Sequence, residues 1–325
     1  MSFYISRTPH RISLFGGGTD HKPFFEKHQS FVINMAINQY SYITARKLPA
    51  FHDYKTKVVY SEVEHVKEND EIKHRIINKV LETLQIYQGL EIIHSSDIPS
   101  GGTGSSAAFT VGLLNVLQAL DRRFTSPKGL AESAVLLERE ILKEATGYQD
   151  AYACSFGGFN LIKFYQDNVN LGPIIVSNEF VRELENSCLL VYVGKRQNER
   201  LANTCFNEIS YQTEEKLKNV LEIAEKGLIA IRKQDLLTVA KLIDESWQIK
   251  KQLSPSVSNQ KIDEIYSKIK FAGGFGKLIG AGGGGFILAV FPQEIRAKIV
   301  SALSGLTVVP FKISYSGSEI IYAQQ

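Results

Sequence analysis

Residues 99–106 form a loop whose composition suits phosphate binding, since they read Pro-Ser-Gly-Gly-Thr-Gly-Ser-Ser. The loop precedes residues 107–120, an almost wholly apolar segment that is typical of a helix. Glycines let backbone N–H groups approach a phosphate, and the first turn of a helix has N–H groups without partners in the helix. The loop has no lysine of the Walker A type, so we expect it to rely on amides, the helix dipole and hydroxyls. Ser105 or Ser106 could also reach a magnesium ion; the alternative is a flexible turn in which Ser105 caps the helix.

Asp150 is a candidate general base. It lies in the segment Gly147-Tyr-Gln-Asp, just past the end of an expected helix over residues 127–145. Transfer of a phosphoryl group to an alcohol needs a proton acceptor beside the hydroxyl, and a carboxylate can fill that role. Glu138, on the same expected helix, is a candidate magnesium ligand if the serine-containing loop lies opposite it. The alternatives are an aspartate in a solvated turn and a glutamate on the surface of a helix.

Asp20 follows three consecutive glycines, residues 16–18, and Thr19. It is close in sequence to Arg11 on the preceding expected strand. A carboxylate in this position could accept hydrogen bonds from substrate hydroxyls, or it could cap a short helix that follows. The sequence leaves both roles open.

A further glycine cluster, residues 277–285, contains the run Gly280-Ala-Gly-Gly-Gly-Gly. The run formally satisfies the dinucleotide-binding pattern G-x-G-x-x-G. That pattern requires a helix after it, whereas the residues that follow, 286–291, are typical of a strand, so we reject a dehydrogenase. Consecutive glycines cost conformational entropy on folding, which favours a place where the backbone approaches a ligand or another loop over a mere connector.

Composition limits the class of protein that these residues belong to. The chain has 325 residues, with 44% hydrophobic and 22% charged residues and a formal net charge of +3. This length fits about two domains, with an active site between them. The weak, scattered charge predicts no nucleic-acid or membrane partner. The three cysteines, Cys154, Cys188 and Cys205, have no metal-ligand spacing and are typical of buried thiols in a reducing compartment. With no signal-peptide pattern in residues 1–11, we expect a cytoplasmic protein.

The elements that must position these residues form an α+β pattern. The expected strands lie at residues 2–15, broken into two at Pro9, and at 31–46, 58–66, 91–94, 156–164, 188–193 and 286–291, with a closing pair within 308–322. The expected helices lie at residues 71–87, 107–120, 127–145, 262–271 and 293–303, and over 198–253 with a break near 233–235. We place the domain boundary after the polar stretch 181–186, which gives domains 1–186 and 187–325.

Together the motifs resemble the GHMP kinase family of small-molecule kinases. Members carry an N-terminal substrate motif, a central phosphate loop and a C-terminal glycine motif in this order, and the chain has all three. The resemblance implies ATP and Mg²⁺ as cofactors and a two-lobed α+β fold. It also implies a ribosomal-protein-like N-terminal domain, a ferredoxin-like C-terminal domain and a site in the cleft. One departure is that the family's usual Gly-Leu-Gly-Ser-Ser is replaced by a shorter loop without the leucine, ending in Thr103-Gly-Ser-Ser.

The resemblance also implies roles for single residues. Asp150 would orient or deprotonate the acceptor hydroxyl, Arg11 would lie beside the transferring phosphate, and Ser106 and Glu138 would bind magnesium. The ATP-binding residues would be Gly101, Gly102, Gly104, Ser105 and Ser106. The substrate-binding residues would be Gly17, Gly18, Thr19, Asp20, Gly282 and Gly283, and residues 282–284 would also support the phosphate loop from the other lobe.

Within the family, several segments resemble the bacterial heptose 7-phosphate kinases, which phosphorylate the anomeric hydroxyl at C1 on the route to GDP-heptose. These segments are residues 7–20, 109–115, 149–152, 156–160 and 280–286. Such a substrate carries a second phosphate, for which Lys195, Arg196 and Arg200 are candidates; the alternative is a solvated basic turn. Two rival functions stay open: a kinase of the fucose or galactose type, and a non-catalytic sugar and nucleotide sensor. The sequence also leaves a homodimer open.

Overall fold

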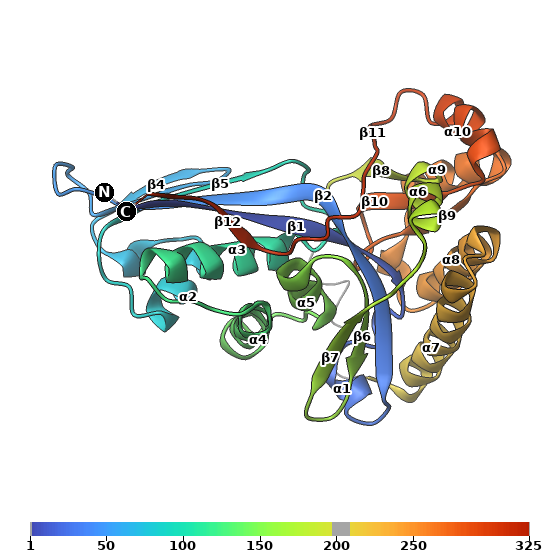
Figure 1. The fold of residues 1–325 in the computed structure, drawn as a ribbon, viewed down its shortest axis with the longest axis horizontal. Helices are drawn as coiled ribbons and strands as arrows, with labels where there is room; N and C mark the ends of the chain where they lie inside the picture. Colours follow the sequence, from blue (N-terminus) through green and yellow to red (C-terminus); the bar gives the residue numbers. More distant parts are fainter. Residues whose placement is uncertain (1, 197–208, 325) are drawn as a thin grey trace.

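The structure is a computed structural model that describes residues 2–196 and 209–324. Its first lobe is built on a sheet with the strand order β12-β1-β2-β5-β3-β4, and β6 pairs with both β2 and β7. The strands are β1 (Phe3–Phe15), β2 (Ser30–Lys47), β3 (Thr56–Val59), β4 (Val63–Val66), β5 (Leu90–Ser96), β6 (Phe159–Phe164), β7 (Val169–Pro173) and β12 (Glu319–Gln324). Helices cover one face of this sheet (Figure 1): α2 (Arg75–Thr83), α3 (Ser105–Leu120), α4 (Pro127–Val135) and α5 (Gln149–Phe156). The short helix α1 (Lys22–Phe25) follows the turn after β1.

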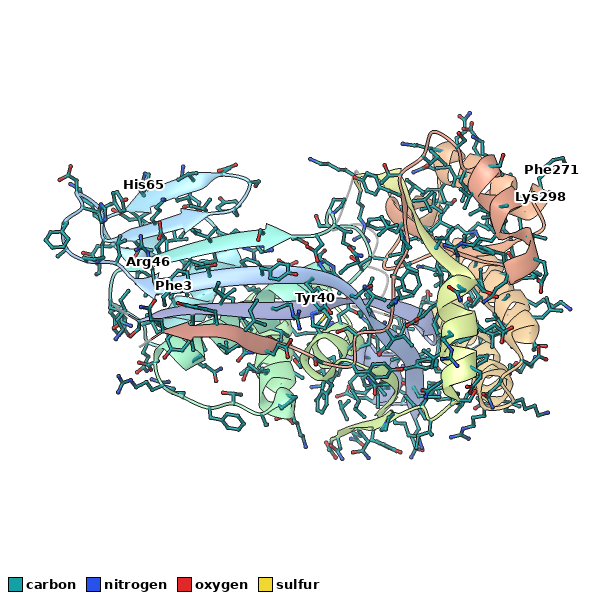
Figure 2. All side chains as sticks on the ribbon, turned by 45° about the horizontal axis from the view of Figure 1, so that its top comes forward. Phe3, Tyr40, Arg46, His65, Phe271 and Lys298 are labelled. Atoms are coloured by element: carbon teal, nitrogen blue, oxygen red, sulfur yellow. The ribbon has the colours of Figure 1, made fainter. Side chains whose placement is uncertain are left out.

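The second lobe has a four-stranded antiparallel sheet in the order β11-β8-β10-β9. Its strands are β8 (Cys188–Gly194), β9 (Phe275–Leu278), β10 (Gly285–Val290) and β11 (Val308–Val309). Its helices are α6 (Asn178–Asn186), α7 (Tyr211–Arg232), α8 (Leu236–Lys251), α9 (Gln260–Phe271) and α10 (Arg296–Ala302). Phe3 of β1 and Arg46 of β2 are paired at one end of the molecule, and Phe271 and Lys298 lie at the other (Figure 2). The expectation of a two-lobed α+β fold is confirmed.

A shared apolar core joins the two lobes. The cluster combines Leu14 and Phe15 of β1 with Ile223 of α7 and Leu288 of β10, all buried. Gly227 of α7 packs so closely on β1 that an added Cβ would lie 2.8 Å from the Phe15 ring. The end of β1 is therefore held between the lobes.

Strand β1 is continuous, so the prediction of two strands broken at Pro9 is wrong. The chain instead keeps pairing with β2 through a register shift between Pro9 and His10. Proline has no N–H to donate to the ladder, and a bulge accommodates it without ending the strand. The irregularity directly precedes His10 and Arg11, two residues whose side chains reach the phosphate loop.

Several other expectations need correction. Residues 58–66 form part of the β3–β4 hairpin rather than one strand, and the helix expected over 127–145 ends earlier, where α4 passes into a π-helical turn, Leu136–Ile141. Helix α5 was not expected at all. The closing strands do not pair with each other, since β11 pairs with β8 and β12 returns to β1. Since β12 pairs with β1, the sheet of the first lobe contains residues from both sides of the expected domain boundary. The division into domains 1–186 and 187–325 stays a prediction. Among the described residues, no helix is both long and apolar enough to cross a bilayer.

Glycines of the two lobes meet backbone to backbone. A Cβ on Gly280 would lie 2.1 Å from the Cα of Gly102, and a Cβ on Gly285 would lie 2.1 Å from the carbonyl oxygen of Gly101. Gly280 and Gly285 also have φ values of +72° and +93°, which side-chain-bearing residues rarely adopt. The phosphate loop is thus seated on the C-terminal glycine cluster, and the alternative that this cluster is a mere connector is wrong.

We predict that Gly280→Ala pushes the phosphate loop away and lowers the free energy of unfolding by about 1–3 kcal/mol, because neither backbone can yield without strain. The measurement is urea unfolding. Gly172→Ala is the matched control, because a Cβ there meets no atom within 4 Å and the backbone needs no positive φ. Equal stability of the two variants would contradict the close contact.

Candidate functional site

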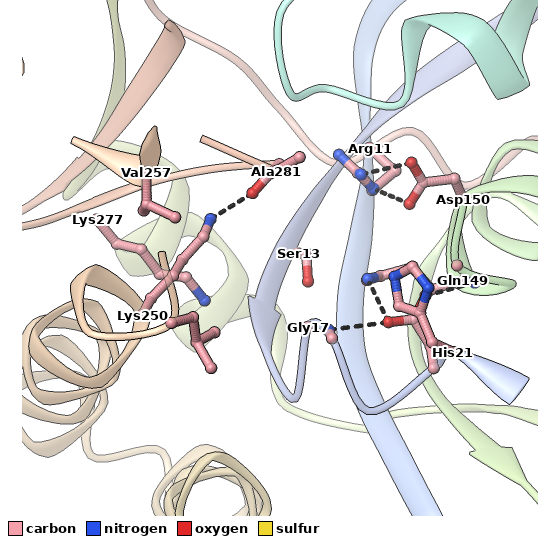
Figure 3. A pocket seen from close by; sticks show the side chains of 15 residues that line it. Arg11, Ser13, Gly17, His21, Gln149, Asp150, Lys250, Val257, Lys277 and Ala281 are labelled. Carbon is pink, nitrogen blue, oxygen red and sulfur yellow. Dashed lines mark hydrogen bonds and ion pairs between the residues drawn. The ribbon is translucent and has the colours of Figure 1, made fainter. Parts of the chain in front are cut away.

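A pocket lies between the lobes, with β1, the turn after it and the start of α5 on one side and α8, β9 and the glycine cluster on the other (Figure 3). Its lining residues are Arg11, Ser13, Gly17, Gly18, Asp20, His21, Gly147, Gln149, Asp150, Lys250, Leu253, Val257, Lys277, Gly280 and Ala281. The pocket therefore brings together Arg11, Asp20 and Asp150, three residues that the sequence suggested and that lie far apart in the chain.

Arg11 and Asp150 form a two-pronged ion pair in this pocket. The Arg11 Nε donates to Asp150 Oδ1 at 2.7 Å, and Nη2 donates to Oδ2 at 2.6 Å. Burial raises the pKa of Asp150 above its usual range, and the Arg11 charge opposes that rise. Asp150 lies in the first turn of α5. The alternative of an aspartate in a solvated turn is therefore wrong.

Arg11 also holds the phosphate loop. Its Nη1 donates to the carbonyl of Gly102, and its backbone N–H donates to the carbonyl of Thr103 at 2.9 Å. The neighbouring His10 lies 3.0 Å from the Thr103 hydroxyl, and burial lowers the pKa of His10 to about 4, so its ring is neutral. Arg11 therefore contacts the candidate base, Asp150, and also fixes the phosphate loop.

The first turn of α3 is open to an anion. Its N-cap is Gly104, which has a left-handed conformation and no side chain, so no side chain caps the helix. The unpaired N–H groups of the first turn suit a phosphate. Ser105 is the first helical residue, which makes the N-cap alternative wrong, and Ser106 is exposed. Residues 101–106 do not line the pocket itself but border it through the Arg11 contacts.

Asp20 ties the turn after β1 to α5. Its carboxylate accepts from the N–H of Gly18 at 3.0 Å and from the backbone and side-chain nitrogens of Gln149, both at 3.1 Å. A Cβ on Gly147 would lie 1.9 Å from Asp20 Oδ2, so only glycine allows this approach. The N-cap of α1 is His21, so the helix-cap alternative for Asp20 is wrong. A carboxylate has about four lone-pair sites. The hydrogen bonds from Gly18 and Gln149 leave Asp20 about one such site for a ligand.

Glu138 is buried at 4% exposure, which rules out the alternative of a surface glutamate. The Thr110 hydroxyl lies 2.9 Å from its Oε1 and 3.0 Å from the carbonyl of Ser106, one turn earlier in α3. Burial is the main cause that raises the pKa of Glu138 to about 7, and the charge of Asp150 adds to it. A buried carboxylate beside a helix N-terminus suits Mg²⁺, which binds proteins through one or two carboxylates and takes further oxygens from phosphates. Among the described residues no three His, Cys, Asp or Glu side chains could form a metal site, so phosphates would have to complete it.

Two pocket-lining lysines of the second lobe, the half-buried Lys250 and the buried Lys277, were missed by the sequence analysis. Lys250 of α8 donates to the carbonyl of Leu278 at 2.8 Å and to that of Gly280, and Lys277 of β9 donates to the carbonyl of Leu14 at 2.9 Å. Burial lowers the pKa of Lys250 well below its usual value and that of Lys277 to about 8, and neighbouring positive charges lower both further. Lys277 begins the glycine cluster, which was the one sequence signal that could have pointed to it.

The structure places the other expected site residues as follows. Gly17 and Gly18 line the pocket, whereas Thr19 is buried and its hydroxyl donates to the carbonyl of Gly16 at 2.8 Å. Gly282 packs on Val257, Gly283 packs on Ser256, and Gly284 packs on Lys195 and Arg196. Gly280 and Gly285, rather than residues 282–284, therefore seat the phosphate loop. Lys195 is exposed, Arg196 is half-buried and close enough to affect the pKa of Lys250, and neither lines the pocket. Arg200 and Cys205 lie outside the described residues.

A pocket between two α+β lobes, with an ion-paired aspartate and a glycine loop at a helix N-terminus, is the arrangement of a small-molecule kinase. Residues 71–158 match the GHMP kinases N-terminal domain, and residues 228–306 match the GHMP kinases C-terminal family. The chain is 31% identical over 319 residues, 92% of each chain, to the D-glycero-alpha-D-manno-heptose 7-phosphate kinase of Campylobacter jejuni. The chain belongs to the GHMP kinase family.

Other similar proteins also match most or all of the chain. The chain is 26% identical to the galactokinase of Pyrococcus furiosus over 340 residues, 92% of each chain. A crystal structure titled as a D-glycero-D-manno-heptose 1-phosphate kinase from Bacteroides thetaiotaomicron superposes with a TM-score of 0.80, covering 100% of both chains at 23% identity. At 23% identity, the similarity to the Bacteroides thetaiotaomicron structure shows a shared fold. The Campylobacter jejuni protein is named a 7-phosphate kinase and the Bacteroides thetaiotaomicron protein a 1-phosphate kinase.

We predict that Glu138→Gln stabilises the metal-free protein at pH 8. Folding raises the pKa of the Glu138 carboxyl from 4.5 to about 7, so the folded protein loses stability as the pH rises through this range. Glutamine cannot ionise, so the variant does not lose this stability. The gain should reach up to about 3 kcal/mol at pH 8 and become small near pH 5. Urea unfolding at both pH values measures it, with the exposed Glu140→Gln as control. Magnesium added with an ATP analogue should stabilise the parent more than the variant; a gain that does not depend on pH would contradict the assignment.

Proposed function

We propose that this GHMP kinase transfers the γ-phosphate of ATP to the anomeric C1 hydroxyl of D-glycero-D-manno-heptose 7-phosphate. The products would be ADP and heptose 1,7-bisphosphate, an intermediate for GDP-heptose synthesis. The observation that carries the proposal is the position of Arg11, which contacts both Asp150 and the carbonyl of Gly102 in the phosphate loop. The resemblance to the Campylobacter jejuni enzyme supports the choice of sugar.

In this mechanism the sugar lies in the pocket with its C1 hydroxyl beside Asp150. The hydroxyl oxygen forms a bond to the γ-phosphorus, the bond from that phosphorus to the bridging oxygen of ADP breaks in line, and the hydroxyl proton passes to Asp150. Arg11 orients the carboxylate and offsets negative charge on the transferring group, and the N–H groups of the first turn of α3 bind phosphate oxygens. Ser106 and Glu138 would hold magnesium, which when bound offsets charge on the phosphates.

The direct test of this function is ADP release with a panel of heptose and hexose phosphates and their phosphate-free forms, followed by NMR to locate the new phosphate. We expect heptose 7-phosphate to have the highest kcat/KM and the new phosphate to be at C1. Better turnover of a phosphate-free hexose would favour the fucose or galactose type of kinase. Nucleotide binding without turnover of any sugar would favour the sensor.

We predict that Asp150→Asn lowers kcat by about 10²–10⁴, because the amide cannot accept the proton, and leaves ATP affinity nearly unchanged. Stopped-flow turnover and calorimetric ATP binding measure the two quantities. Asp244→Asn is a suitable control, because that carboxylate pairs with Lys270 in the second lobe, outside the pocket lining. Near-normal turnover of Asp150→Asn would remove Asp150 from this role.

A further inference from the structure

The second-lobe wall of the pocket carries two cations that the proposed transfer does not use. Lys250 and Lys277 enter from this wall, opposite Arg11 and Asp150 (Figure 3). Lys277 is buried and Lys250 is half-buried, and in the described part of the chain their ammonium groups donate only to backbone carbonyls and pair with no carboxylate. Cations removed from solvent without an anionic partner are unfavourable, so the charges of these two lysines are not balanced by the residues around them.

The other charges of the pocket do not complete it. Arg11 and Asp150 satisfy each other in their ion pair, and Asp20 is held by N–H groups of Gly18 and Gln149. The charged groups close enough to affect the two lysines are themselves positive: Arg11 for both, and Lys277 and Arg196 for Lys250. An anionic group of a ligand on this wall would supply the missing partner.

We propose that Lys250 and Lys277 form the subsite for the phosphate that the sugar substrate already carries. This inference rests on the proposed function, because it takes the C1 hydroxyl to lie beside Asp150. The nucleotide phosphates are assigned to the opposite side, at the first turn of α3. A heptose 7-phosphate carries its phosphate at the end of the molecule away from C1, which directs it from Asp150 toward the two lysines. The subsite would replace the role expected for Lys195 and Arg196, neither of which lines the pocket.

The subsite predicts discrimination between a sugar phosphate and the same sugar without phosphate. Lys250→Met and Lys277→Met keep the apolar stem and remove the charge. Each should raise the KM for heptose 7-phosphate by about 10- to 100-fold, the effect of losing a charged hydrogen bond, and change the KM for the phosphate-free heptose and for ATP by less than about threefold. Lys298→Met, on the exposed face of α10, is the matched control and should change none of these values. Equal losses for both sugars would indicate a structural role, and a raised KM for ATP would assign the lysines to the nucleotide; either result would overturn the proposal.

Proton uptake gives a readout that does not depend on turnover. Since the pKa of Lys277 is about 8, this lysine is mostly neutral at pH 9, and a bound phosphate dianion would favour its charged form. A phosphate monoester has its second pKa at about 6, so at pH 9 the ligand itself takes up no proton. Calorimetry in buffers of different ionisation enthalpy should therefore show proton uptake on binding heptose 7-phosphate. The titratable and charged groups on the facing wall are Arg11, Asp20, His21 and Asp150, and Arg11 itself lowers the pKa of Lys277. Uptake should fall in Lys277→Met, where only Lys250 remains to gain a proton, and be kept in Asp150→Asn; uptake unchanged in Lys277→Met would overturn the assignment.

The same binding measurement separates the two proposals. If heptose 7-phosphate binds to the parent with lysine-dependent proton uptake but is not phosphorylated, the proposed function fails and the anion subsite stands. If heptose 7-phosphate is phosphorylated at C1 and the lysine variants handle both sugars alike, the function stands and the subsite fails. If heptose 7-phosphate neither binds nor reacts, both are overturned.

Discussion

The site depends on one side chain, Arg11, whose guanidinium lies between an aspartate and a backbone carbonyl. Two of its nitrogens contact Asp150, and the third contacts Gly102 of the phosphate loop. A planar guanidinium has its donors in a fixed arrangement, so it sets the direction of the carboxylate as well as its distance from the loop. The position of Arg11 is fixed by two features of β1: the bulge after Pro9 and the burial of the end of the strand between the lobes.

The second constraint is steric and involves glycine. The phosphate loop and the C-terminal glycine cluster are in contact at two places: Gly101 contacts Gly285, and Gly102 contacts Gly280. At both places an added Cβ would overlap the opposing backbone. The phosphate loop is thus held from the first lobe by Arg11 and His10 and from the second lobe by glycine backbone. The support on both sides gives the loop a defined position.

Much of this could be predicted from local sequence. The phosphate loop, the apolar helix α3 and the strand after the glycine cluster have strong local signals, and Arg11 and Asp150 do meet in one pocket. Helix α5 escaped prediction because Gly147 is typical of a helix end and the next aromatic residues are typical of a strand. The contacts of Asp20 depend on Gln149, far along the chain, so its local pattern could not reveal them. Lysines are usually solvated, and the burial of Lys277 and the partial burial of Lys250 arise only when α8 and β9 pack against the first lobe.

A crystal structure with magnesium, a non-hydrolysable ATP analogue and heptose 7-phosphate bound together would test the proposed arrangement of the two substrates directly. We expect the γ-phosphate beside Arg11 and the first turn of α3, with the anomeric hydroxyl within hydrogen-bond distance of Asp150. A nucleotide bound away from residues 101–106, or a sugar whose C1 hydroxyl lies far from Asp150, would contradict it.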